Sequence, residues 1–242
     1  CFDDLATQSR QRCLMSAPPV LLLHGFGTSF SATWEGNGWT EILAEAGRQI
    51  IGVDLLGHGQ AAKPTDPEAY RAVADEVLKE LPNEPVDVVA FSYGARIALE
   101  LAALYPERFH RLVVGGVGQN LFRHDPERRA AMIEAVRTGQ APDPELRYFA
   151  NLPEAPGAER LALVAFLERP VDQEMNEELL SKVTAPVLVA LGDRDFAGPG
   201  QPLVDALPQG ELTTLRGLDH FATPKDFGFL DAALTFLDAH PF

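Results

Sequence analysis

The stretch that decides the fold is residues 86–96, which read Val-Asp-Val-Val-Ala-Phe-Ser-Tyr-Gly-Ala-Arg. An apolar run of strand length leads into Ser92, and a helical pattern over 93–104 follows at once. A sharp corner between strand and helix needs small residues two positions before and two after the serine, and Ala90 and Gly94 meet that need. We expect this corner to push the Ser92 hydroxyl outward as a nucleophile. The alternative is a serine that only caps the helix.

Short apolar runs of this kind recur along the chain, and glycine closely follows each of them. They lie at 20–23, 49–56, 111–117 and 185–191. Amphipathic stretches of helical length lie at 39–48, 67–81, 93–104 and 225–239. Continuous apolar strands indicate a sheet that is covered on both faces. The alternation of strands and helices therefore predicts an α/β fold with a mainly parallel central sheet and helices on both faces.

Residues 121–184 interrupt this alternation. They contain helical patterns near 125–138, 143–150, 157–168 and 173–182, separated by prolines, and no strand pattern. A segment of this length without strands is too long for an ordinary connection. We interpret 121–184 as a helical lid between two parts of a core, residues 1–120 and 185–242.

The composition excludes several classes of protein. The chain has 242 residues, 46% of them hydrophobic and 23% charged, which fits a soluble globular protein. Its 20 basic and 35 acidic residues give a formal charge of -15, which would repel nucleic-acid phosphates and anionic lipid. No apolar run approaches the roughly 18 residues that a membrane helix needs. We therefore expect neither a nucleic acid nor a membrane as partner.

The two cysteines, Cys1 and Cys13, both lie near the N-terminus. They are too few for a disulfide framework or a four-ligand zinc site. A first residue other than Met indicates a trimmed or processed start, and a mature lipoprotein would also begin with Cys. Residues 1–17 do not resemble a signal peptide. We expect a cytoplasmic location and no bound metal.

A serine nucleophile needs a base, and the base needs an orienting carboxylate. His220 lies in a loop after the strand-like run 211–215, and Asp193 and Asp195 follow the run 185–191. The carboxyl ends of parallel strands meet at one edge of a sheet, where open α/β sheets gather their ligands. The chain order is then Ser, Asp, His, and either aspartate is a candidate for the acid.

From Pro18 to the C-terminus, the chain resembles the α/β-hydrolase fold superfamily. The family's nucleophile corner is similar to the stretch around Ser92. Its oxyanion loop is similar to 24–27, His-Gly-Phe-Gly, and its Asp-x-x-Gly-x-Gly loop matches 54–59. The resemblance implies a mainly parallel sheet with a variable helical lid.

The second half of the chain carries the rest of the resemblance. The family's Gly-x-x-Asp acid motif matches 192–195, which favours Asp195 over Asp193. Its late histidine aligns with His220. The resemblance therefore implies a catalytic triad of Ser92, His220 and Asp195, with no metal and no organic cofactor.

The resemblance also implies an oxyanion hole and a pocket. The N–H groups of Phe26 and Tyr93 would hold the oxyanion, with Gly25 beside them. The apolar residues that flank the triad in sequence and would line the pocket are Phe91, Tyr93, Phe196 and Phe221. Lid residues that would cover it are Met132, Phe149, Leu163 and Phe166. Core packing explains each of these aromatic and aliphatic residues equally well.

Three departures from the family pattern bear on the chemistry. Ala90 and Ala95 stand where the family has glycine, which leaves the fold intact. Serine at 92 is more informative, because members that open epoxides or displace halide have aspartate there. The stretch before Pro18 is short for the family's first antiparallel strands.

The remaining titratable residues have structural interpretations. His24 and His58 lie in glycine-bracketed turns where the family keeps a structural imidazole. Three further histidines, His110, His124 and His240, have charged or proline neighbours and are expected to face solvent. Five arginines, at 108, 111, 123, 128 and 129, fit a solvated face better than an anion site, although a substrate with a carboxylate is not excluded.

The sequence therefore predicts a serine hydrolase that cleaves a small to medium carboxylic ester. One alternative keeps the triad and changes the reaction to perhydrolysis of the haloperoxidase-like kind, carbon–carbon bond hydrolysis, lactone opening or thioester cleavage. Another is a hydrolase-fold receptor that senses a ligand. The expected partner is a small-molecule acyl compound, and spacing alone gives neither its acyl group nor the oligomeric state.

Overall fold

The structure is a computed structural model that describes residues 17–123, 125–171 and 173–241. Cys1, Cys13, His124 and the stretch 1–16 lie outside the described residues. The expectations made for them stay predictions.

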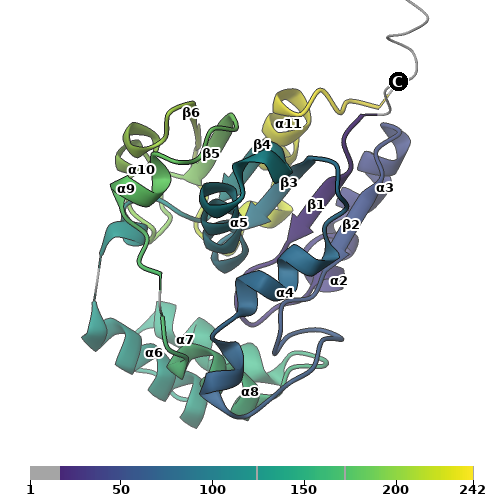
Figure 1. The fold of residues 1–242 in the computed structure, drawn as a ribbon. Coiled ribbons are helices and arrows are strands. Elements are labelled where there is room, and N and C mark those ends of the chain that lie inside the picture. The colour runs from purple at the N-terminus through teal and green to yellow at the C-terminus, as the bar shows by residue number, and fades with distance from the viewer. Residues whose placement is uncertain (1–16, 124, 172, 242) are drawn as a thin grey trace, which may run out of the picture.

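The centre of the fold is a six-stranded parallel sheet (Figure 1). Its strands are β1 Val20–Leu23, β2 Ile50–Val53, β3 Val86–Phe91, β4 Phe109–Gly115, β5 Val187–Gly192 and β6 Gly210–Leu215. They lie in the order β2-β1-β3-β4-β5-β6. The order reverses between β1 and β3, where Leu23 pairs with Ala90. Such a reversal opens a crevice at the carboxyl ends of the two strands.

Helices connect the strands. The α-helices before residue 121 are α2 Phe30–Thr33, α3 Trp39–Glu45, α4 Val73–Glu80 and α5 Tyr93–Leu104. Those that follow are α6 Pro126–Thr138, α7 Pro144–Asn151, α8 Arg160–Glu168, α9 Glu177–Leu180, α10 Gln201–Ala206 and α11 Phe227–Phe236. Short 3-10 helices are η1 Glu35–Asn37, η2 Pro67–Tyr70, η3 Pro106–Arg108, η4 Gln119–Phe122, η5 Leu152–Glu154 and η6 Thr223–Lys225.

Strands β1, β2, β3, β4 and β5 contribute side chains to two apolar cores, because successive side chains of a strand point to opposite faces. Leu21 and Leu23 of β1 pack with α4, α5, α9 and α10 on one face. Val20 and Leu22 pack with α3 and α11 on the other. All four are fully buried. The predicted α/β class, with a parallel sheet covered on both faces, is confirmed.

Residues 121–184, here called the insertion, connect β4 to β5. Within the ranges that the structure describes, the insertion contains helices and no strand. Helices α6, α7 and α8 gather at one end of the molecule, apart from the sheet (Figure 1). Phe149 and Leu163 belong to a small apolar core in the insertion, and Phe26 and Phe221 of the sheet-bearing part pack against it. The insertion therefore lies over the loops that follow β1 and β6.

Helix boundaries agree with the prediction where the pattern is strong and differ where tertiary contacts intervene. Helix α5 covers 93–104 as expected. The predicted helix 67–81 is broken into η2 and α4, because Asp66 caps η2 and buried Tyr70 donates its hydroxyl hydrogen to the Pro64 carbonyl at 2.6 Å. Helices α2 and α10 carry no long amphipathic pattern and were not predicted.

A buried ionic cluster lies at the amino ends of the strands, opposite the carboxyl ends where β1 and β3 open a crevice. Asp87 of β3 is paired with the guanidinium of Arg48, which also donates to the carbonyls of Pro18 and Leu237. His110, which we expected to face solvent, has an exposed ring whose Nδ1 lies 2.8 Å from Asp87 Oδ1. The strand positions explain this contact, because β4 lies beside β3 in the sheet.

Candidate active site

Ser92 occupies a strained corner between β3 and α5. Its backbone has φ 53° and ψ -114°, in a region that non-glycine residues seldom adopt. The Ser92 N–H donates to the Gly115 carbonyl at 2.8 Å, which ties the corner to β4. The Ser92 side chain makes no capping bond to helix α5. The serine is therefore held by its backbone, which leaves its hydroxyl free for another partner.

The small residues around Ser92 are explained by close backbone packing. A Cβ at position 94 would lie 2.5 Å from the His24 carbonyl oxygen and 2.6 Å from that of Leu23. Backbone cannot move aside as a flexible side chain can, so only glycine fits at 94. Ala90, which stands where the family pattern has glycine, is fully buried in the sheet core.

The structure brings Ser92, His220 and Asp195 into one hydrogen-bonded line. Nε2 of His220 lies 3.0 Å from Ser92 Oγ, and Nδ1 lies 2.9 and 3.1 Å from the two Asp195 carboxylate oxygens. A carboxylate only accepts, so the proton is assigned to Nδ1 and the Nε2 lone pair faces the serine. His220 and Asp195 are buried, while Ser92 is partly exposed.

The second aspartate is not part of this line. Asp193 is exposed and accepts from the Gly217 N–H at 2.7 Å. Asp195 accepts a further bond from the Ala197 N–H at 2.8 Å, which fixes its carboxylate. The geometry therefore separates the two candidates that the local sequence left open.

The backbone amides of Phe26 and Tyr93, the two expected oxyanion donors, lack hydrogen-bond partners in the described part of the chain. Tyr93 is the first residue of α5, where helix N–H groups lack partners within the helix. A Cβ at Gly25 would lie 3.2 Å from the Ser92 Cβ, so the loop that carries Phe26 passes close to the serine. Both amides are available near the Ser92 hydroxyl.

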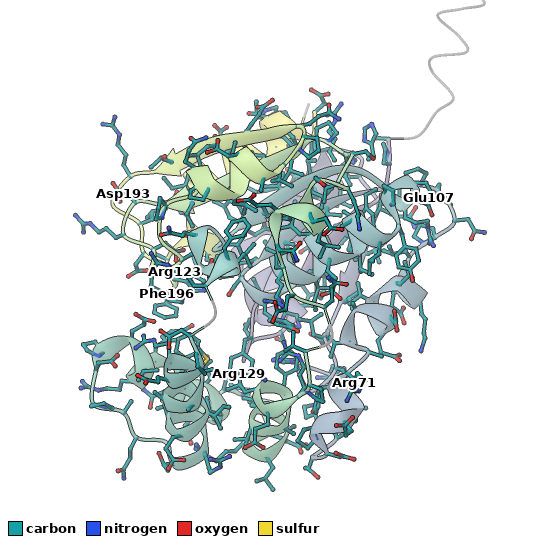
Figure 2. All side chains as sticks on the ribbon, turned by 60° about the vertical axis from the view of Figure 1, so that its left-hand side comes forward. Arg71, Glu107, Arg123, Arg129, Asp193 and Phe196 are labelled. Carbon is teal, nitrogen blue, oxygen red and sulfur yellow. The ribbon has the colours of Figure 1, made fainter. Side chains whose placement is uncertain are left out.

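Aromatic side chains surround His220. The ring centroids of Phe196 and Phe91 lie 4.2 and 4.8 Å from that of the imidazole. Phe196 is partly exposed and lies between the sheet-bearing part and the helices of the insertion (Figure 2). Phe221 stacks on Tyr148 of α7 with centroids 3.5 Å apart. Sequence reasoning missed Tyr148, because its helix shows nothing that places it over the loop after β6.

The insertion supplies the other side of this aromatic region. Phe166 of α8 lies 4.7 Å from the ring of Tyr93 and 5.5 Å from that of Phe26. Phe149 of α7 contacts the rings of Phe26 and Phe196. Leu163 and Met132, which we also expected here, belong to the apolar core of the insertion. The insertion therefore adds aromatic side chains to the group formed by Phe26, Tyr93 and Phe196.

His24 and His58 lie behind the loop after β1. In fully buried His24, Nδ1–H donates to the Gly25 carbonyl at 2.7 Å and Nε2 accepts from the Leu55 N–H at 3.0 Å. His58 donates from Nδ1 to the Leu56 carbonyl at 3.1 Å, and its Nε2 has no partner among the described residues. Burial lowers the pKa of both, that of His58 to about 3.

Acid should destabilise the protein through His58. In the unfolded chain its pKa is near 6.5, so the unfolded state takes up a proton below that pH while the folded state stays neutral down to about 3. The free energy of unfolding should therefore fall by about 1.4 kcal/mol per pH unit in this window, or about 2 kcal/mol at pH 5. Urea unfolding at pH 7 and pH 5 measures this change. A His58→Asn protein should lose that part of the pH dependence, and an identical dependence in both proteins would contradict the assignment.

The five arginines considered from the sequence do not converge on one anion site. Two of them lie outside the insertion, where Arg108 donates to the carbonyls of Leu81 and Pro82 and Arg111 pairs with Asp238. The three others bond within or beside the insertion. Arg123 donates to Gln119, Arg128 pairs with Asp143 and Glu145, and Arg129 donates to the carbonyls of Leu167 and Arg169.

Metal sites and membrane spans can be checked only over the described part of the chain. There, no three His, Cys, Asp or Glu side chains come together in a way that could hold a metal ion. No helix in those ranges combines the length and apolar character needed to cross a membrane.

Family comparison agrees with the fold. A model of the alpha/beta hydrolase fold matches residues 18–197. The chain belongs to this family, whose curated relatives include hydrolases. A 2-hydroxymuconate semialdehyde hydrolase of Pseudomonas sp. strain CF600 is 38% identical over 104 residues, which cover 40% of this chain and 36% of the relative.

A longer match is to the pimeloyl-[acyl-carrier protein] methyl ester esterase of Neisseria meningitidis, 28% identical over 88% of this chain and 74% of the relative. The chain spans only about a third of the length of several other relatives. Among solved structures, the 2-hydroxy-6-oxo-6-phenylhexa-2,4-dienoate hydrolase from Rhodococcus sp. strain RHA1 superposes with TM-score 0.68 and 21% identity. That match covers 92% of this chain and 90% of the other, and shows a shared fold.

Proposed function

We propose that this member of the alpha/beta hydrolase family is a serine hydrolase that cleaves a small to medium carboxylic ester through an acyl-enzyme on Ser92. The observation that carries the proposal is the line from Ser92 Oγ through His220 to Asp195, with successive separations of 3.0 and 2.9 Å. Nucleophile, base and orienting carboxylate each stand within hydrogen-bond reach of the next, as acyl transfer requires.

The reaction would proceed in two halves. His220 Nε2 takes the proton of Ser92 as its oxygen attacks the ester carbonyl, and the imidazolium returns that proton to the departing alcohol. Asp195 stabilises the imidazolium and keeps the Nδ1–H tautomer. A water molecule, deprotonated by the same nitrogen, then hydrolyses the acyl-serine and releases the acid.

The negative oxygen formed in each half would bind to the N–H groups of Phe26 and Tyr93. Both donors are free within the described residues and belong to backbone that is already fixed. Prearranged donors of this kind stabilise the transition state because they need no reorganisation, and losing one costs roughly 100- to 1,000-fold in rate. The aromatic side chains around His220 favour an apolar acyl or alcohol group next to the reacting carbon.

Carbon–carbon bond hydrolysis is the second candidate. It is supported by the 38% identity to a 2-hydroxymuconate semialdehyde hydrolase, although that match covers 40% of this chain. The same nucleophile, base and amides would serve both reactions.

Product analysis separates the candidates. We expect release of acid and alcohol from short p-nitrophenyl and alkyl esters. The panel also contains lactones, thioesters and a 1,5-diketone, each assayed with and without peroxide. If no ester in the panel is hydrolysed and the diketone is cleaved rapidly, carbon–carbon bond hydrolysis would replace ester hydrolysis as the favoured function.

A further inference from the structure

Arg169 differs from Arg137 and Arg160 of the insertion, which both pair with carboxylates. Arg137 pairs with Glu134 and Glu168, and Arg160 pairs with Glu154. Arg169 is only partly exposed, yet no ion pair to a carboxylate is found for it within the described ranges. Burying a cation without an anionic partner is costly, so such an arrangement needs a reason.

The guanidinium of Arg169 is held close to the proposed site. Its carbon lies 4.5 Å from the ring centroid of Tyr93 and 4.4 Å from that of Phe166. One nitrogen donates to the Tyr93 hydroxyl and another to the Phe166 carbonyl. Tyr93 follows Ser92 directly in the chain, so Arg169 contacts the side chain of the residue next to the proposed nucleophile.

The backbone of Arg169 is fixed as well. Helix α8 ends at Glu168 with Arg169 as its C-cap, because Pro170 follows and disfavours helical conformation at the residue before it. Arg129 of α6 donates to the carbonyls of Leu167 and Arg169 at 2.7 and 2.8 Å. The Arg129 guanidinium therefore holds the backbone of this turn in place. The Arg169 side chain contacts the Tyr93 ring.

The surroundings of Arg169 are positive, in a chain whose net charge is -15. Burial lowers the pKa of Arg169, and the neighbouring Arg96 and Arg129 lower it further. Glu100 is the acidic group that interacts with this cluster, and burial raises its pKa while Arg96 and Arg169 lower it. An arginine stays protonated under such conditions, so the site retains positive charge for an anion.

Some N–H groups of the Arg169 guanidinium have no hydrogen-bond partner among the described residues. A guanidinium has five N–H groups in a planar fork that matches a carboxylate. Two of them are used by Tyr93 and the Phe166 carbonyl, and the rest have no partner in the portion of the chain described. Two parallel N–H groups are what a bidentate carboxylate requires.

We propose that Arg169 binds a carboxylate carried by the substrate at a distance from the reacting carbonyl, so that the preferred acyl group is apolar near Ser92 and anionic at its far end. This proposal rests on the function proposed for Ser92. Arg169 acts on specificity and touches the remote end of the substrate, while the bond is broken at Ser92.

A matched pair of esters tests the proposal. The probes are p-nitrophenyl hexanoate and the p-nitrophenyl monoester of adipic acid, which has the same chain ending in a carboxylate. In Arg169→Met, the ratio of kcat/KM for the anionic over the neutral ester should fall roughly 10- to 100-fold, the usual range for hydrogen bonds to charged groups. Arg169→Lys should lose less. Arg137→Met, which removes the same charge from the insertion, should keep the wild-type ratio.

Two outcomes would overturn the proposal. A parallel fall for both esters in Arg169→Met would show that Arg169 only supports Tyr93. An equal fall of the ratio in Arg137→Met would show a bulk charge effect.

Binding without turnover separates this proposal from the proposed function. Adipate should raise the melting temperature of Ser92→Ala, and adding Arg169→Met should remove the shift. If neither ester is cleaved, the ester hypothesis fails, and the adipate shift still decides the role of Arg169.

Discussion

Replacing Ser92 by alanine should reduce the hydrolysis of a short p-nitrophenyl ester by roughly ten-thousand-fold or more, since residues of a triad act as a unit and loss of the nucleophile removes almost all of their effect. The substitution deletes one oxygen whose bond within the described residues is to His220. The fold should survive, because the Ser92 backbone bond to Gly115 does not use the side chain. Initial rates, with the melting temperature as a check on folding, measure the effect.

Ser181→Ala is the matched control for this experiment. Its hydroxyl donates to the Glu178 carbonyl on the exposed surface of the insertion, so its loss should leave turnover near wild type. A fluorophosphonate probe adds a test that does not depend on the choice of ester. It should label the folded wild type and spare Ser92→Ala. Equal ester hydrolysis in wild type and Ser92→Ala would remove the proposed mechanism, and absent labelling of folded wild type would favour a ligand-sensing role.

Asp195→Asn should cost about ten-thousand-fold in kcat although it changes the shape of the side chain very little. The Ala197 N–H, 2.8 Å from Oδ1, would hold the amide oxygen at that position and put the amide nitrogen at the Oδ2 position, 3.1 Å from His220 Nδ1. A donor in that place favours the imidazole tautomer with its proton on Nε2. That nitrogen could then no longer accept the proton of Ser92.

Asp193→Asn is the matched control for this substitution, two positions earlier in the same loop. Asp193 is exposed and bonds the Gly217 amide, so its replacement should change kcat only a few-fold. The comparison is made by steady-state kinetics over a range of pH, with thermal melting to confirm folding. If Asp193→Asn were the more damaging of the two, Asp195 would not be the orienting acid.

The fold class was predictable because it depends on patterns that repeat along the chain. Buried strands such as β3 and β5 are continuous apolar runs, and α5 begins and ends where its pattern does. Short elements such as α2 and α10 carry too few residues to show a period. The break between η2 and α4 depends on the burial of Tyr70, which no local pattern reports.

Much of the candidate site was also visible in the sequence. Ser92 and Gly94 belong to one tight turn. Its steric requirement can be recognised from neighbouring residues of the sequence, because only glycine fits at position 94. Asp195 and His220 were found through their places after strands and through a family resemblance. Their roles in catalysis stay predictions until the variants above are measured, while the structure adds the distances that make them testable.

Tyr148 and Arg169 could not be found in this way. Both lie in the insertion, and each matters because of what it contacts across the chain, Phe221 for the first and Tyr93 for the second. Helix periodicity tells which face of a helix is apolar and leaves open which distant loop that face meets.

By itself, the sequence determined the parallel α/β sheet, the sharp turn at Ser92 and the order in which the chemical groups follow the strands, because backbone sterics and hydrophobic periodicity act between near neighbours. The acid motif favoured Asp195 over Asp193, but only the tertiary structure showed that Asp195 meets His220, that the Phe26 and Tyr93 amides have no partner among the described residues, and that Arg169 lies against Tyr93. These outcomes depend on how the insertion and the loops pack over the sheet edge, and such packing joins residues that are far apart in the chain.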